Sequence, residues 1–147
     1  MHTCIYARMH VCIHACMHAC MYAYMHVFGG LKTVGGDVEL RENRMLTKLQ
    51  GLEGLTNIGR KLRIEDNLAM TSLQGLECVT NIGDDLIIEN NNAMTSLQGL
   101  EGVTNIGDDF IIENNSAMTS LEGLEGVTNI SDDLTIARPR GLDEYCR

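Results

Sequence analysis

The amino-acid sequence predicts a repeat solenoid of about five 24-residue coils, each contributing one short parallel strand. One unit recurs without insertion: TSLQGLECVTNIGDDLIIENNNAM (71–94) is followed by TSLQGLEGVTNIGDDFIIENNSAM (95–118). The apolar residues keep fixed positions, and one stretch of the unit has the alternation of a strand. A constant period of this length is typical of solenoids, in which each coil buries its apolar positions against its neighbours.

The predicted strand is typified by Leu86–Glu89, which is rich in β-branched residues. Stacked coils place these stretches side by side, about 4.8 Å apart, as a parallel sheet. Alternation then directs Leu86 and Ile88 inward and Ile87 and Glu89 outward. The other apolar residues of the coil are spaced by three, which predicts 3₁₀-like or irregular turns opposite the sheet. The equivalent strands are residues 38–41, 62–65, 110–113 and 134–137.

The repeat also predicts the core and a structural ladder. A buried turn must satisfy its backbone groups, and an asparagine side chain offers both a donor and an acceptor. We therefore interpret one asparagine column as a ladder, with a ligand-binding row of carboxamides as the alternative; this column is Asn43, Asn67, Asn91 and Asn115. A second column is Asn57, Asn81, Asn105 and Asn129. The predicted core of one coil is Leu73, Leu76, Val79, Ile82, Leu86, Ile88, Met94 and Leu97.

The chain divides into a low-complexity segment (1–28), the solenoid (29–137) and a tail (138–147). Residues 1–28 are variants of the tetrad MHAC, which one set of codons writes as the string ATGC repeated, so a translated microsatellite explains them. An incidental helix and a Cys/His metal site are the alternatives. Because a helix places i+2 on the opposite face, the histidine and cysteine stripes would not converge on one ion. We predict that this segment is disordered or an incidental helix and holds no metal.

The tail departs from the repeat. After Ile136 the sequence becomes ARPRGLDEYCR, and Pro139 occupies the ladder position of Asn115. Together with the opening tetrads, this departure fits a truncated gene model or a fragment of a larger protein. The charge-poor opening run is interrupted by Arg8 and five histidines, so we predict neither a signal peptide nor a membrane span in the chain. The six cysteines form no recognisable disulfide framework.

The charge distribution and the absence of catalytic motifs reduce the classes of function that the sequence favours. Between Ile64 and Ala137 there are 14 Asp and Glu and no Lys or Arg, which disfavours nucleic acid and suits cations or basic partners. A solvated face that keeps a repetitive protein soluble is the alternative. Outside the tetrads the sequence has no Ser-His-Asp or Cys-His arrangement, phosphate-binding loop or zinc signature. We therefore predict no enzyme and no cofactor.

Binding is the leading hypothesis, on the outward strand residues. Ile87 beside Ile111 is expected to be an exposed apolar pair flanked by a carboxylate row, which suits a basic amphipathic protein surface or a glycan. Stacked glutamates repel at strand spacing, and calcium is conceivable there and at pairs such as Asp84–Asp85. The calcium-binding β-roll nonapeptide is absent, so no metal site is predicted. The second hypothesis is a structural spacer without a ligand of its own. The candidate residues are Arg63, Glu65, Ile87, Glu89, Ile111 and Glu113.

One phrase of the repeat resembles a known family. The pattern L-x-x-I-x-G-D-L-x-I-x-x-N, as in VTNIGDDLIIENN, is similar to the receptor L domain, the leucine-rich-repeat-like extracellular module of insulin and epidermal growth factor receptors, over residues 30–136. The resemblance implies a leucine-rich-repeat- or β-helix-like solenoid with an extracellular or cell-surface binding role. VGGDVEL (34–40) keeps the Gly-Gly-Asp of that family, whereas later coils replace the second glycine, for example by Arg60 or Asp84. If this position requires a positive φ, Asp tolerates it better than Arg.

Overall fold

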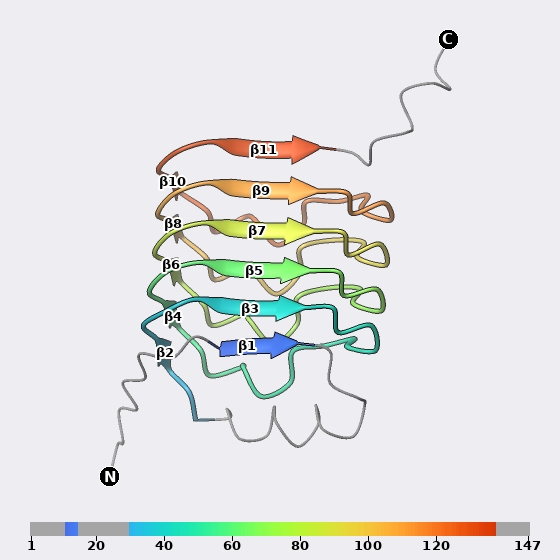
Figure 1. Cartoon of the computed structure of the whole chain (residues 1–147). Coiled ribbons are helices and arrows are strands. Elements are labelled where there is room, and N and C mark those ends of the chain that lie inside the picture. The colour runs from blue at the N-terminus through green and yellow to red at the C-terminus, as the bar shows by residue number, and fades with distance from the viewer. Residues whose placement is uncertain (1–10, 15–29, 138–147) are drawn as a thin grey trace.

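The structure, a computed structural model, describes residues 11–14 and 30–137. Over these residues the chain is an all-β parallel solenoid of about four 24-residue coils, with no helix, which confirms the predicted fold class (Figure 1). Our expectations for residues 1–10, 15–28 and 138–147 concern parts of the chain outside this description.

The longer strands lie where the sequence predicts them. They pair in parallel, and every step between neighbours is 24 residues, so that Leu62 lies opposite Leu86 and Leu86 opposite Phe110. Figure 1 shows them stacked one above another. These strands are β3 (Val38–Arg41), β5 (Leu62–Glu65), β7 (Leu86–Glu89), β9 (Phe110–Glu113) and β11 (Leu134–Ala137).

A second, narrower sheet accompanies the first, whereas the sequence predicts one strand per coil. Each of its strands has two residues, too few to show alternation in the sequence, and the isoleucine of each inner strand, such as Ile82, is buried. The rest of each coil consists of irregular turns, as the spacing of three predicts. The short strands are β2 (Thr33–Val34), β4 (Asn57–Ile58), β6 (Asn81–Ile82), β8 (Asn105–Ile106) and β10 (Asn129–Ile130).

The opening segment contributes one strand to the wide sheet. Val11–His14 form β1, which pairs in parallel with β3 and places Val11 opposite Val38. The sequence predicts disorder or an incidental helix here, so the structure differs for these four residues. The physical reason is that the free edge of β3 offers backbone N–H and C=O groups, and Val11 and Ile13 are β-branched residues that favour a strand.

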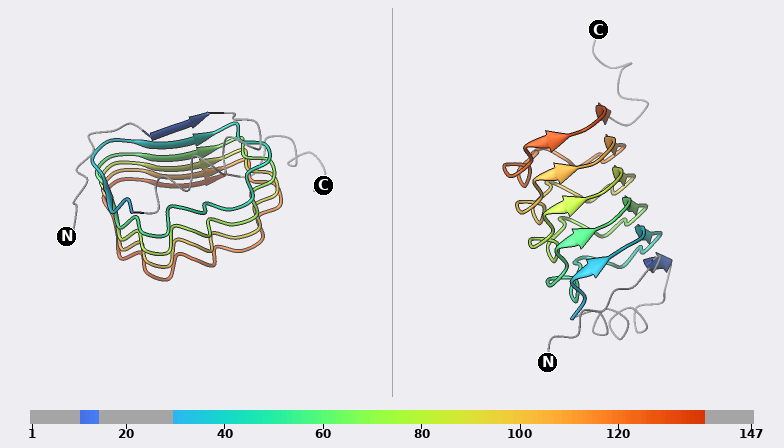
Figure 2. Two further views of the ribbon diagram at one scale, coloured as in Figure 1. Left: turned by 90° about the horizontal axis from the view of Figure 1, so that it is seen from below. Right: turned by 90° about the vertical axis from the view of Figure 1, so that its left-hand side faces the viewer.

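The core follows the predicted columns. Each of the eight residues predicted for the coil from Leu73 to Leu97 is 0% exposed, which confirms that prediction. Figure 2 (left) looks along the stack and shows the coils superimposed, so equivalent core positions form continuous columns. Phe110 continues the column of Leu62 and Leu86 and is also 0% exposed.

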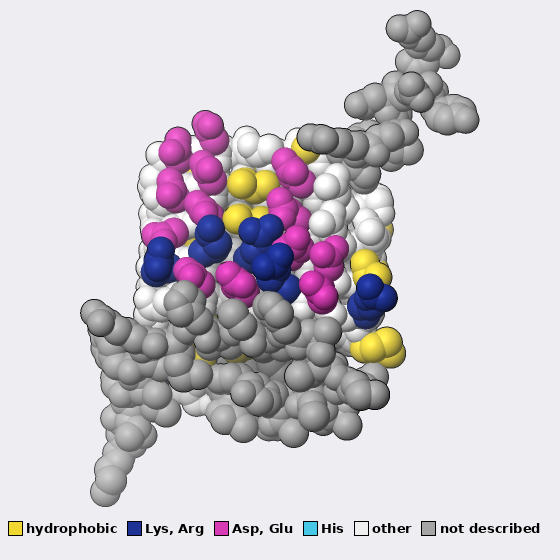
Figure 3. All heavy atoms as spheres, viewed as in Figure 1, with side chains coloured by type: hydrophobic (Ala, Val, Ile, Leu, Met, Phe, Trp, Pro, Cys, Tyr) yellow, Lys and Arg dark blue, Asp and Glu magenta, His cyan; other side chains and the backbone are white. Residues whose placement is uncertain are grey.

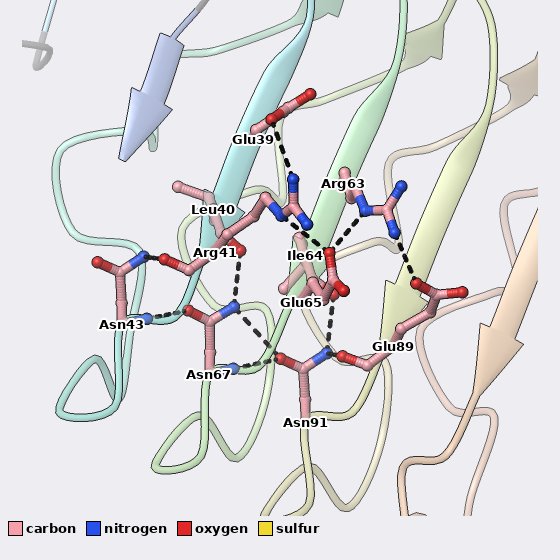
Figure 4. A network of polar contacts seen from close by, with 10 residues as sticks. All are labelled: Glu39, Leu40, Arg41, Asn43, Arg63, Ile64, Glu65, Asn67, Glu89 and Asn91. Atoms are coloured by element: carbon pink, nitrogen blue, oxygen red, sulfur yellow. Dashed lines mark hydrogen bonds and ion pairs between the residues drawn. The ribbon is translucent and has the colours of Figure 1, made fainter. Parts of the chain in front are cut away.

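Asparagine side chains bond consecutive coils together at the buried turn after each long strand. The Asn91 Oδ1 atom accepts the backbone N–H of Asn67 at 3.0 Å. The Asn91 Nδ2 atom donates to the backbone oxygens of Ile64 and Glu89, both at 2.9 Å (Figure 4). Asn67 and Asn115 donate in the same way to Leu40 and Ile88 of the preceding coil. The column therefore satisfies backbone groups that water does not reach.

Two backbone positions in each coil have a positive φ. Residues just before the ladder asparagines have φ of 55–59°: Glu42, Asp66, Asn90 and Asn114. The first glycine of each GLEG-type phrase has a φ of 100–114°. These glycines are Gly51, Gly75, Gly99 and Gly123. Neither position is the one that Arg60 and Asp84 occupy, so the conditional expectation of a positive φ there does not hold.

Replacing Asn91 by Ala should destabilise the solenoid by about 2–4 kcal/mol, because the N–H of Asn67 and the C=O of Ile64 lose their partners while they remain buried. Urea denaturation followed by circular dichroism measures this loss. Asn92→Ala is the matched control, since Asn92 is exposed, and should cost less than about 0.5 kcal/mol. Equal losses for the two variants would contradict a structural role of the ladder.

Gly99→Ala should cost about 3 kcal/mol, because φ is +110° and an added Cβ would lie 2.1 Å from the backbone oxygen of Leu73. Gly30→Ala is the control, because nothing lies within 4 Å of a Cβ built at Gly30. Thermal unfolding of both variants measures the difference. A Gly99→Ala protein as stable as Gly30→Ala would show that the coils do not pack as closely as described.

Candidate functional site on the strand face

The candidate binding residues all lie on one surface, which we call the strand face. It consists of the outward side of β3, β5, β7, β9 and β11 together with the corner that precedes each of these strands. The parallel register aligns them in two columns. The first is Glu39, Arg63, Ile87, Ile111 and Thr135; the second is Arg41, Glu65, Glu89, Glu113 and Ala137. Figure 3 looks onto this face and shows acidic side chains on both sides, apolar side chains between them, and basic side chains below.

Arginines neutralise the lower, amino-terminal half of the face. The Arg41 Nε atom lies 2.8 Å from a carboxylate oxygen of Glu65. Arg63 contacts the same Glu65 oxygen at 2.8 Å and reaches Glu89 in the next coil at 3.0 Å (Figure 4). Partial burial alone lowers the pKa of Arg63, but its hydrogen bond to Glu65 and the charges of Glu65 and Glu89 raise the pKa above its ordinary value. The predicted repulsion between Glu65 and Glu89 is therefore offset.

The corner before β5 has ion pairs of the same kind. Arg60 lies 3.2 Å from Asp84 and 3.8 Å from Asp37, so it bridges the coils before and after its own. Lys61 lies 2.9 Å from Asp85. Arg60, Lys61 and Arg63 thus form a basic cluster within one coil, and each pairs with an acidic residue of a neighbouring coil.

Ile87 is not the exposed residue that the sequence suggests. It points to the outer side of β7 but is only 6% exposed, whereas Ile111 is partly exposed. In the parallel register Arg63 and Ile111 lie directly on either side of Ile87. Side chains at this spacing are in contact, so the two neighbours shield Ile87 from water. The apolar strip is therefore shallow, and Ile111 is its accessible part.

The upper, carboxyl-terminal half of the face carries carboxylates without basic neighbours. Glu113, Asp108 and Asp132 have no ion pair among the residues that the structure describes, and residues 64–137 include no Lys or Arg. Carboxylates that repeat at strand spacing repel one another, and no basic side chain among residues 11–14 and 30–137 pairs with these three.

Three of these carboxylates are close together. Ligand oxygens of Asp108, Asp109 and Asp132 all lie within 4.8 Å of one another. Asp109 has a structural role as well, because its Oδ1 atom accepts the backbone N–H of Asp133 at 3.0 Å. Desolvation, together with the negative charges of Asp85 and Asp109, raises the pKa of Asp108 above its ordinary value. Exposed acidic groups of this kind are common without an ion, so this cluster alone does not define a metal site.

Sequence reasoning misses a group of structural glutamates. The Glu101 carboxylate accepts the backbone N–H of Gly99 at 2.9 Å, and Glu125 accepts that of Gly123 at 2.9 Å. Glu53 and Glu77 do the same for Gly51 and Gly75. The available signal is a constant glutamate two residues after a constant glycine. These carboxylates hold turns and are not available as a ligand-binding row.

No protein-family model matches this chain, and no curated protein or solved structure matches it significantly. Residues 11–14 and 30–137 contain no helix with the length and hydropathy to cross a membrane. Cys78, which replaces the glycine of the later coils, is an exposed free thiol.

Asp108→Asn should raise the melting temperature slightly at neutral pH, because it removes one charge from the repelling row. Since the native pKa of Asp108 is raised, the native state binds this proton more tightly than the unfolded chain does. The carboxylate therefore costs stability above its native pKa, and that cost is absent below the ordinary value of 3.8. The gain should disappear in acid and shrink as salt rises from about 20 mM to about 500 mM.

Glu122→Gln is the control for this measurement, because it removes one charge from a turn between β9 and β10, outside the strand face. A gain of the same size for both variants, or a gain that persists in acid, would contradict local repulsion at Asp108.

Proposed function

We propose that this chain is a non-catalytic binding module whose strand face, over β7, β9 and β11, takes a positively charged segment of another protein. One observation carries the proposal: on both sides of the partly exposed Ile111 stand carboxylates that form no ion pair with the described residues. In the lower half of the same face arginines fill equivalent positions, so the open charge is confined to the coils above Arg63.

The spacing of the two acidic rows suits an extended peptide. The corner aspartates and the glutamates at the strand ends are separated by a four-residue strand, which spans about 13 Å. A peptide lying along the stack reaches both rows with Lys or Arg side chains and places an apolar side chain on Ile111. Binding then relieves the repulsion within each row, and the negative field speeds the encounter with a basic partner.

The resemblance to the receptor L domain supports the same class of function. The phrase VTNIGDDLIIENN lies at the corner and long strand that build the face, and a leucine-rich-repeat-like module of that kind implies an extracellular or cell-surface recognition role. A glycan is the other ligand that an apolar pair flanked by carboxylates suits. A glycan depends on hydrogen bonds and flat apolar contact rather than on open negative charge, so the acidic rows favour the basic protein segment.

A fluorescent peptide with two adjacent Lys residues on each side of an apolar residue presents Lys to both rows, because adjacent side chains of an extended chain point to opposite sides. It should bind the full chain, and its affinity should fall steeply as salt rises. The double variant Asp108→Asn with Glu113→Gln should weaken binding about fivefold to tenfold, because two carboxylates next to Ile111 lose their charge. The matched control, Glu42→Gln with Glu122→Gln, removes the same net charge at two exposed residues away from β9 and should change binding less than about twofold. Fluorescence anisotropy measures both.

Equal effects of the two double variants would show attraction to net charge alone and would contradict a site. Binding of neutral oligosaccharides, lost on Ile111→Asp but insensitive to salt, would favour the glycan instead. Absence of both kinds of binding would leave the structural spacer as the function.

A further inference from the structure

The carboxyl-terminal end of the described solenoid exposes side chains that are core residues in every inner coil. Leu121 is 45% exposed, Leu134 52% and Ile136 51%. The equivalent residues one and two coils earlier lie in the core; Leu97, Phe110, Leu86 and Ile88 are 0% exposed and Ile112 is 2% exposed. We call this surface the end face. It has the shape of a solenoid cross-section, which is complementary to another coil.

The end face is also an open sheet edge. Within the described residues β11 pairs only with β9, so its other side offers backbone N–H and C=O groups. The opposite end of the same sheet differs, because β1 pairs with β3 there. One end of the wide sheet is thus covered by a strand and the other is not.

The residues that follow β11 do not encode another coil of the repeat. A 24-residue step from Asn115 reaches position 139, which is Pro139, and proline has neither the carboxamide of the ladder nor a backbone N–H. A step from Met118 reaches Leu142 within a segment, RPRGLDEYCR, that shares no phrase with the repeat. The sequence directly after β11 therefore does not continue the repeat unit.

We propose that a second copy of this chain covers the end face, with the two β11 strands paired antiparallel about a two-fold axis. Directly opposite residues in an antiparallel pair point to the same side of the sheet. The register that places Leu134 opposite Ile136 forms two inward apolar pairs and sets Thr135 opposite its own copy on the outward side. A shift by two residues in either direction retains only one such pair, so this register buries the most apolar surface.

The charges around β11 fit this orientation. Asp132 and Asp133 precede the strand and Ala137 ends it. Antiparallel pairing places the start of one strand beside the end of the other, so Asp133 of one copy lies opposite Ala137 of the second copy and away from that copy's aspartates. A parallel arrangement stacks aspartates on aspartates, as Asp108, Asp109 and Asp132 already are within one chain. The acidic corner therefore disfavours a parallel partner and favours the two-fold dimer.

The full chain should be a concentration-dependent dimer in analytical ultracentrifugation. In a Thr135→Cys variant, mild oxidation should join the two chains through a 135–135 disulfide, because opposite Cα atoms of an antiparallel pair lie about 4.5–5.5 Å apart. Peptide mass spectrometry distinguishes this bond from those of the native cysteines. Thr119→Cys, an exposed threonine outside β11, is the control and should give no 119–119 bond.

A charge exchange tests the orientation without changing the apolar surface. Ala137→Asp should raise the dimer dissociation constant about tenfold, because it sets a carboxylate opposite Asp133 of the second copy, and adding Asp133→Lys to it should restore most of the affinity. A monomer at all concentrations without the 135–135 bond would overturn the proposal, as would open polymers. Asp108→Asn with Glu113→Gln should leave the dimer unchanged, so failure here and failure of the proposed peptide site are separate results.

Discussion

The coils stack because the buried turn after each long strand finds hydrogen-bond partners in the neighbouring coils. Asn91 bonds to the N–H of Asn67 and to the C=O of Ile64, which lie 24 and 27 residues earlier in the chain. An inserted or deleted residue in any coil would move one of these partners and leave buried backbone groups without bonds, at about 1–3 kcal/mol each. The constant period is therefore imposed by hydrogen bonding as well as by apolar packing, and the sheet register, the core columns and the aligned surface charges follow from it.

The same repetition explains which features the sequence reveals. Strand bounds and core positions can be predicted from the sequence because each column repeats an apolar residue at one spacing, as Leu62, Leu86 and Phe110 do. The positive φ at Glu42 and Asp66 cannot be predicted in this way, since acidic residues there resemble any other charged surface residue. Burial of Ile87 depends on the neighbours that the register brings beside it, and alternation alone assigns it to solvent. β1 depends on the free edge of β3 as well as on its own β-branched residues, and the tetrad repeat gives no sign of that edge.

Repetition also multiplies charge, because a carboxylate in one coil recurs at strand spacing in the next. The chain offsets this over its first coils with Arg41, Arg60, Lys61 and Arg63, each of which pairs with a carboxylate of an adjacent coil. Beyond Arg63 the unit repeats nearly unchanged and the compensation stops. The candidate site lies in the coils whose carboxylates have no Arg or Lys partner among the described residues. Its position therefore depends on the difference in ion pairing between the two halves of the strand face, and not on a single distinctive residue.

The two proposed surfaces meet at Asp132, and their geometry connects them. In the two-fold dimer the wide sheets of both copies form one continuous sheet. The strands of the two copies run in opposite directions, so the acidic corners of the two chains lie along opposite edges of that sheet. Asp133 then lies opposite Ala137 of the second copy, whereas Asp108 and Glu113 lie one coil inside and keep their open charge. Two peptide sites therefore remain on the same side of the assembly. A partner with two basic segments would engage both at once, and the second contact would be favoured by effective concentration without any new interaction.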